Sequence, residues 1–265
     1  DMSMTINLSL PVHEPLLVVN ATAEADNNIK VYVTNSIDPL SSDFFEYIDD
    51  AVVLLKGEQL LDTLMFDSKG HYLSNEELEG GRIYHIEVNH SDFSQVFSEV
   101  YVPYAVQILA AELGVISDYF RAFEFEIDDP LAQDDFYLLK MKGYVEGYGW
   151  EGLWFESNEP SFDNKDFWEE SFDSRKILFN DQLFNGTNKT FNMDVEYWQE
   201  LDSVMVVLHT VSESFYKYHM SRRLQNQNGP SEILGAEPVV VYSNIQNGFG
   251  VFTATAKADF IITTD

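Results

Sequence analysis

The chain has 265 residues, of which 45 are acidic and 15 basic, giving a net charge of −30. So strong a negative field repels phosphates and anionic lipid headgroups, which argues against nucleic-acid binding and a basic membrane-binding surface. The content of 45% hydrophobic and 14% aromatic residues argues against a disordered acidic chain, and the lack of cysteine excludes disulfides, thiolate metal sites and cysteine nucleophiles.

A polarity period of two residues dominates the chain and predicts β-strands. Apolar and polar side chains alternate over residues 29–34, 84–89, 123–127 and 191–197. Continuous apolar runs at 51–55 and 204–208 predict strands that are buried on both faces. Turn residues separate these segments, and Asn247-Gly248 predicts a tight hairpin. The spacing is typical of a β-sandwich rather than of alternating strands and helices.

This mainly β chain is expected to divide into two domains near Pro103. Residues 1–103 hold about seven short strand candidates, which is the size of an immunoglobulin-like or transthyretin-like sandwich. Residues 104–265 hold longer strands and predict a larger antiparallel β domain, sandwich or barrel-like, with one C-terminal helix. No flexible Gly/Ser linker separates the two parts, so we expect them to pack against each other.

The single helix is predicted at about residues 212–228. Thr210 and Glu213 have the spacing of a capping box, and Gly229-Pro230 is a stop signal. Basic side chains in the middle and last turns suit the helix dipole, and they also leave open a role in docking an acidic partner. These side chains are Lys217, His219, Arg222 and Arg223.

Enzyme signatures are mostly absent from the sequence, which favours a non-enzymatic protein. It has no nucleophile elbow, zinc-binding His-Glu-x-x-His helix, phosphate loop or dinucleotide fingerprint. The six histidines are scattered, so strand residues such as His85 and His209 are expected to be structural. A hydrolase with an unrecognised acidic site, using Asp134 or Asp135, is the alternative.

The densest acidic segment of the chain runs from residue 128 to residue 135. Its carboxylates are Asp128, Asp129, Asp134 and Asp135. Oxygen ligands crowded into a turn suit a hard cation such as Ca²⁺, although the spacing differs from that of an EF-hand. The segment therefore predicts either a calcium site or a solvated turn between two strands.

A second distinctive segment, residues 144–172, is rich in aromatic residues and glycine and holds three of the four tryptophans. Exposed aromatic rings anchor sugars, peptides and protein partners, because they desolvate a large area at little entropic cost. The alternative is a hairpin whose alternate aromatics fill a sheet core. The candidate contact residues are Tyr148, Trp150, Trp154, Phe155 and Trp168.

Six short segments, in order along nearly the whole chain, carry a family resemblance. They are Leu10–Pro15 with Leu17–Asn20, Val102-Pro103, Asp134–Tyr137, Asp181–Gly186, Ser214–Tyr218, and Pro238 with Ser243–Phe252. Together they resemble the uncharacterised Bacteroidetes outer-membrane lipoproteins grouped as domain-of-unknown-function family 4249. Gln182 stands where that family usually has proline, and Ala21 where it usually has glycine.

The matched motif residues are interpreted as structural, because they contain no nucleophile–base pair. Asn247 and Gly248 suit a turn with positive φ, Gly250 permits close backbone approach, and Asn244 is a short amide suited to bonding backbone groups. The same interpretation applies to Asp181, Phe184, Gly186 and Tyr216.

The resemblance implies where the protein acts and with what partner. It implies an exported protein at the outer membrane, held there only by a lipid anchor that lies outside this sequence, and often encoded beside TonB-dependent receptors. The expected function is that of a non-enzymatic accessory to a TonB-dependent transporter in nutrient binding or uptake, with a glycan or peptide ligand. A structural or adhesive cell-surface β-sandwich protein is the alternative.

Overall fold

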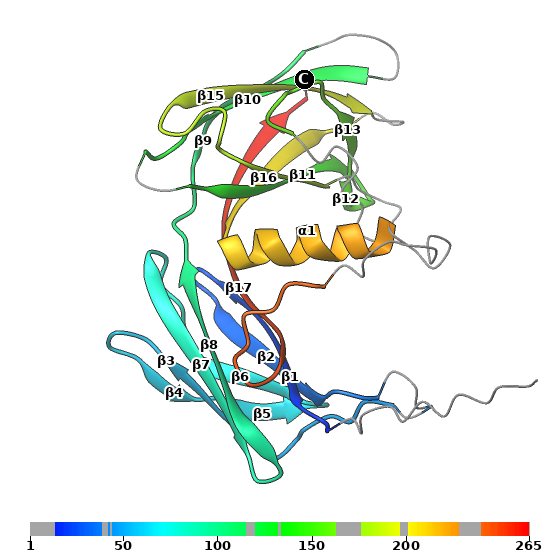
Figure 1. The fold of residues 1–265 in the computed structure, drawn as a ribbon. Coiled ribbons are helices and arrows are strands. Elements are labelled where there is room, and N and C mark those ends of the chain that lie inside the picture. The colour runs from blue at the N-terminus through cyan, green and yellow to red at the C-terminus, as the bar shows by residue number, and fades with distance from the viewer. Residues whose placement is uncertain are drawn as a thin grey trace, which may run out of the picture.

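The computed structural model of the chain describes residues 14–38, 42, 44–114, 120–131, 134–162, 176–196, 201–227 and 240–264. Strands and one helix make up the regular structure of this part (Figure 1). The strands are arranged in two stacked pairs of layers, so the predicted mainly β fold with one C-terminal helix is confirmed.

The N-terminal half is a sandwich of two layers around one core. One layer contains β1 (Leu17–Glu24), β2 (Asn28–Asn35), β6 (His71–Glu77) and β5 (Met65–Ser68). The other contains β4 (Leu61–Thr63), β3 (Val52–Lys56), β7 (Arg82–His90) and β8 (Phe93–Val102). Ile29, Val31 and Val33 are fully buried between the layers, as their alternation predicts. The expectation that residues 51–55 are buried on both faces is wrong, because Val52 lies on the outer face of β3 and is 49% exposed.

The C-terminal half is a second sandwich with an aromatic core. One layer has the order β13 (Trp154–Glu156), β15 (Asn188–Glu196), β10 (Phe120–Asp128) and β9 (Ile108–Leu113). The facing layer contains β12 (Gly149–Gly152), β11 (Phe136–Val145), β14 (Lys176–Asn180), β16 (Ser203–Val211) and β17 (Phe249–Thr263). Phe125 and Phe191 stack between the layers with ring centroids 4.9 Å apart.

One long strand, β17, connects the two sandwiches. Its residues 249–255 pair in parallel with β1, and its residues 255–263 pair antiparallel with β16. Figure 1 shows it, in orange and red, running from the N-terminal half into the C-terminal half. The change of sandwich falls after β8, which ends at Val102, but Phe252 and Ala254 pack in the N-terminal core. The hairpin expected at residues 247–248 is instead a turn that leads into a parallel strand. The strand after this turn, β17, pairs in parallel with β1, whereas a hairpin would join two antiparallel strands.

Helix α1 (Glu213–Gln227) directly follows β16 and lies where the sequence predicts a helix. Its N-terminal cap differs from the predicted one. Thr210 lies within β16, where its hydroxyl accepts a hydrogen bond from the Val106 amide at 3.0 Å. The Ser212 hydroxyl caps the helix instead, accepting from the Phe215 amide at 3.2 Å. Apolar residues of the helix pack on Leu138, Leu178 and Val211. Among the described residues, no helix is both long and apolar enough to cross a membrane.

The turn before β17 is held by the side chain of Asn244. Its Oδ1 accepts from the Phe252 amide and its Nδ2 donates to the Phe252 carbonyl, both at 2.8 Å, so the side chain pairs with the backbone as a strand would. Gly250 follows with φ of 104°, and a Cβ there would lie 2.0 Å from the carbonyl oxygen of Val19. The parallel pairing of β17 with β1 therefore requires glycine at this position.

Replacing Gly250 by alanine should lower the free energy of unfolding by more than about 4 kcal/mol, because the methyl group displaces β1. Gly147→Ala is the matched control, since Gly147 also has positive φ, at 86°, but has nothing within 4 Å of its Cβ position. That control should lose only the backbone strain of about 1–2 kcal/mol. Urea unfolding followed by fluorescence measures both, and equal losses would contradict the close-approach argument.

In the C-terminal sandwich, the layer that contains β11, β14, β16 and β17 carries a group of basic residues around His209 on its outer face. Lys257 of β17 lies opposite His209 in the sheet register, and Lys140 of β11 pairs with Lys176 of β14. Burial first, and then the positive charge of the nearby lysines with Lys140 foremost, together lower the pKa of His209 from 6.5 to about 4. His209 is thus a structural strand histidine, as the sequence predicts, and it is neutral at pH 7.

This shift predicts a pH dependence of stability. Between pH 6.5 and about 4 the unfolded chain binds a proton at His209 that the folded chain does not, so the free energy of unfolding falls as pH falls through that window. From pH 7 to pH 5, wild type should lose up to about 2 kcal/mol more than His209→Gln. Urea titrations at the two pH values measure the difference, and parallel losses in both proteins would refute it.

Candidate functional site

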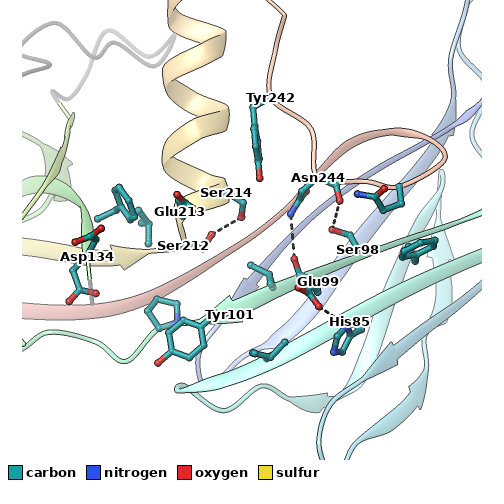
Figure 2. Close-up of a pocket in the computed structure, with 18 residues that line it drawn as sticks. His85, Ser98, Glu99, Tyr101, Asp134, Ser212, Glu213, Ser214, Tyr242 and Asn244 are labelled. Carbon is teal, nitrogen blue, oxygen red and sulfur yellow. Dashed lines mark hydrogen bonds and ion pairs between the residues drawn. The ribbon is translucent and has the colours of Figure 1, made fainter. Parts of the chain in front are cut away.

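A cleft of about 630 Å³, here called the junction cleft, lies where the two sandwiches meet. Strands β7 and β8 of the N-terminal half form one wall (Figure 2). The opposite wall is formed by the start of β11, the start of helix α1 and the segment that leads into β17. The cleft therefore draws its lining from segments that are more than a hundred residues apart in the sequence, and β17 holds them together.

The wall formed by β7 and β8, here called the strand wall, presents pairs of side chains from the two strands on its solvent-facing side. Ile83 lies opposite Tyr101, and His85 lies opposite Glu99 with 3.5 Å between Nδ1 and Oε2. Phe97, one pair further along, is 47% exposed, and Ile83 is 54% exposed. Large apolar and aromatic surface on rigid strands is a good anchor for a ligand, because little side-chain entropy remains to be lost.

The opposite wall, here called the helix wall after α1, presents hydroxyl groups that already form hydrogen bonds with backbone groups. Ser214 Oγ donates to the Phe252 carbonyl at 2.9 Å, and Ser98 Oγ donates from the strand wall to the Asn244 carbonyl at 2.9 Å. Ser212 Oγ accepts from the Ala254 amide in addition to capping the helix. The His85 ring contacts the Glu99 carboxylate through Nδ1, and the three cleft serines bond to backbone groups, with Ser212 and Ser214 also bonded to each other.

The charge of the cleft lining is negative. Glu99, Asp134, Asp135 and Glu213 line it, and the lining residues that the structure describes include no lysine or arginine. Figure 2 shows Asp134 and Glu213 on the helix side and Glu99 on the strand side. Such a lining favours ligands that carry positive charge beside an apolar surface.

Behind the helix wall, three buried aspartates converge. Asp129, Asp135 and Asp181 each place one carboxylate oxygen within 4.8 Å of those of the other two. Asp129 and Asp135 belong to the acidic segment that the sequence predicts to be either a calcium site or a solvated turn, whereas its other two members, Asp128 and Asp134, are exposed. The third carboxylate comes from Asp181, which the sequence analysis assigned only to a structural motif.

The carboxylates of this aspartate trio accept hydrogen bonds from within the fold. Asp129 accepts from the hydroxyl of Tyr137 and, at 2.8 Å, from the Gly186 amide, while Asp181 accepts from the Asp135 amide at 2.9 Å. Burial raises the pKa of Asp129 and of Asp181, and burial beside Asp129 raises the pKa of the Tyr137 hydroxyl. The three aspartates are at most 3% exposed, whereas Asp134, the other acid named for the hydrolase alternative, is exposed at the cleft.

The residues of the Asp181–Gly186 motif build one turn around this trio. The Asp181 carbonyl accepts from the Phe184 and Asn185 amides, and the Phe184 ring packs in the C-terminal core against Phe191. Gly186 has φ of 71°. Tyr216 of helix α1 lies nearby, since its hydroxyl accepts from the Asn180 side chain at 3.4 Å. The motif builds a turn and also supplies the third carboxylate.

Those predicted aromatic contact residues that the structure describes do not form a single exposed surface. Tyr148 and Trp150, at the β11–β12 hairpin, are 78% and 39% exposed, and Trp154 is half-buried. Phe155 is fully buried in the C-terminal core, so its assignment to an exposed contact surface is corrected to a core residue. Trp168 lies outside the described residues. The physical reason is alternation, because Trp154 and Phe155 are neighbours on one strand and point to opposite faces.

Sequence reasoning missed the cleft residues Phe97, Tyr101 and Tyr242. A signal for two of them exists in β8, where buried Val96, Ser98, Val100 and Val102 occupy one face and Phe97 and Tyr101 fall among the outward positions. Together with exposed Ile83 on β7, these two rings form an apolar patch, and contiguous exposed apolar patches mark interaction sites. Nothing in the spacing indicates that Tyr242 faces them across the junction.

Comparison with known proteins gives one sequence match and several distant structural ones. A search of curated proteins finds no significant match. A DUF4785 family protein of Legionella pneumophila is 8% identical with a TM-score of 0.29, and the match covers 74% of this chain but only about half, 52%, of that protein. A segment of two fibronectin type-III domains from chicken tenascin is 8% identical with a TM-score of 0.23, covering 74% and 90%.

A protein of Bacteroides uniformis, named as a candidate carbohydrate-binding protein, is 8% identical with a TM-score of 0.24, covering 94% of this chain and 99% of that one. TM-scores this low carry no argument about fold or function. The sequence match is decisive by contrast, because the model of one family aligns with residues 4–260. The chain therefore belongs to the family described as a domain of unknown function, DUF4249.

Proposed function

We propose that this chain is a non-enzymatic surface binding protein, accessory to a TonB-dependent transporter, and that the junction cleft is its binding site. The observation that carries the proposal is the cleft itself, which has the size of a ligand site and combines exposed aromatic anchors with an acidic lining. The place of action, a lipid anchor at the outer membrane, follows from the resemblance of the chain to lipoproteins of its family.

The cleft is built before any ligand arrives. Hydrogen bonds of Ser98 and Asn244 tie the strand wall to the segment entering β17, and Ser214 ties the helix to the same strand. Groups held in this way lose little further entropy on binding, so more of the contact energy remains as affinity. A preformed cleft therefore favours a role in ligand recognition over a role as a spacer.

The ligand class follows from the lining. Acidic side chains surround exposed Phe97, Ile83 and Tyr101, and this combination recognises a peptide segment in which lysine or arginine stands beside an apolar residue. A loop of the transporter or a peptide nutrient has this chemistry. Binding to such a segment weakens as salt is added, because the attraction is partly between exposed charges.

Site-specific photocrosslinking in the organism that encodes the protein tests the proposal. A crosslinking amino acid in place of Tyr101 should give a covalent adduct that mass spectrometry identifies as a TonB-dependent transporter. The same amino acid in place of Tyr148 tests the aromatic hairpin as a rival surface. An adduct from Tyr148 alone would move the site to the hairpin, and adducts with host-matrix proteins would favour the adhesive function.

A truncation pair measures the energetics of the same site. Phe97→Ala should weaken the complex with the captured partner by about tenfold, as expected for a central aromatic anchor. Phe66→Ala is the matched control, because Phe66 is 45% exposed on β5, in the layer that does not line the cleft, and should leave the affinity unchanged. Equal affinities for the two variants, measured by calorimetry, would refute the cleft as the binding site.

A further inference from the structure

The aspartate trio lies at one end of the C-terminal sandwich, where three strands start or stop. Asp129 directly follows β10, Asp135 directly precedes β11, and Asp181 directly follows β14. Strand β10 belongs to one layer, whereas β11 and β14 belong to the other. The three carboxylates therefore meet between the layers, and whatever holds them together also holds the two layers together.

Asp129 and Asp181 bring negative charge together, with little positive charge from described residues to compensate it. Among the described residues, no lysine or arginine forms an ion pair with Asp129 or Asp181. The donors to these two side chains are one hydroxyl and two backbone amides. Buried like charges at this separation repel strongly in a low-dielectric interior, and either protons or a cation must offset that repulsion.

An independent observation points to a ligand. Asp181 is fully buried, one of its oxygens accepts from the Asp135 amide, and the other, Oδ1, is buried with no hydrogen bond. Buried polar atoms are normally satisfied, so an open carboxylate oxygen inside a cluster of carboxylates marks a position for a missing partner. A metal ion is the partner that satisfies all three side chains at once.

We propose that Asp129, Asp135 and Asp181 form a calcium site that clamps the two layers of the C-terminal sandwich. The donor set consists of carboxylate oxygens, which hard cations prefer, and it contains no histidine or thiol that would favour zinc or copper. Calcium accepts six to eight oxygens in an irregular arrangement, whereas Mg²⁺ demands a regular octahedron and keeps its water. Carboxylates contributed by three separate strand ends match calcium better.

The ion reaches the trio from the junction cleft. Asp135 belongs to the trio and also lines the cleft, so the trio borders the cleft at this residue. The neighbouring Asp134 is exposed at the same wall and adds to the local negative potential that draws a cation in. Calcium bound here fixes the start of β11, and with it one wall of the cleft.

Calcium titration of the purified 265-residue chain, after treatment with a chelator, tests the site. Isothermal calorimetry should show one saturable calcium site that Mg²⁺ does not fill at equal concentration. Thermal unfolding should shift upward by about 5–10 °C at a calcium concentration 100 times the Kd. Asp181→Asn should abolish both effects, because the amide keeps the acceptor for the Asp135 amide but loses the charge.

Asp128→Asn is the matched control, since Asp128 is exposed and next to Asp129, and it should retain the calcium site. Without calcium, Asp181→Asn should melt no lower than wild type, because the substitution relieves repulsion. If Asp181→Asn fails to fold, Asp135→Asn replaces it, and the wild-type titration stands by itself. Wild type without a saturable site, equal filling by Mg²⁺, or calcium binding kept in the Asp181 variant would each overturn the proposal.

Discussion

The parallel pairing of β17 with β1 is the interaction on which the rest of this structure depends. It differs from every other ladder in the described part of the chain, all of which are antiparallel, and it brings residues 249–255 beside residues 18–24. The hydroxyls of Thr22 and Thr253 meet at 2.9 Å across this ladder. Because the same strand continues antiparallel to β16, one sheet runs through both sandwiches and sets their relative position. The cleft exists only because these two halves are fixed in this way.

The alternation of side chains was sufficient to predict the strands but not their partners. Ile86 and Val88 of β7, or Phe123 and Phe125 of β10, are buried as the period of two requires. Period says nothing about which strand lies beside which, so the double pairing of β17 was not predictable. The helix was placed correctly, whereas its cap moved from Thr210 to Ser212 because β16 continues through Val211.

The candidate sites show a similar division between local and long-range information. Asp129 and Asp135 were found in the acidic segment, but Asp181 lies 46 residues further along and is brought in by the pairing of β14 with β11. The aromatic segment pointed to exposed rings, of which Tyr148 is one, while Phe155 fills the core. The cleft itself joins side chains from β8, from the start of β11 and from residues 242–246, and only the closed fold defines it.

The position of β17 also has a consequence for the order in which the chain folds. Phe252 and Ala254, near the end of the sequence, complete a hydrophobic core whose other members lie almost entirely within the first 102 residues. Contacts so distant along the chain slow folding, since a long loop has to close before they form. The first sandwich therefore cannot complete its core until residues 249–255 have paired with β1. Until then the edge of β1 that pairs with β17 stays open, and the places of Phe252 and Ala254 in the core stay empty.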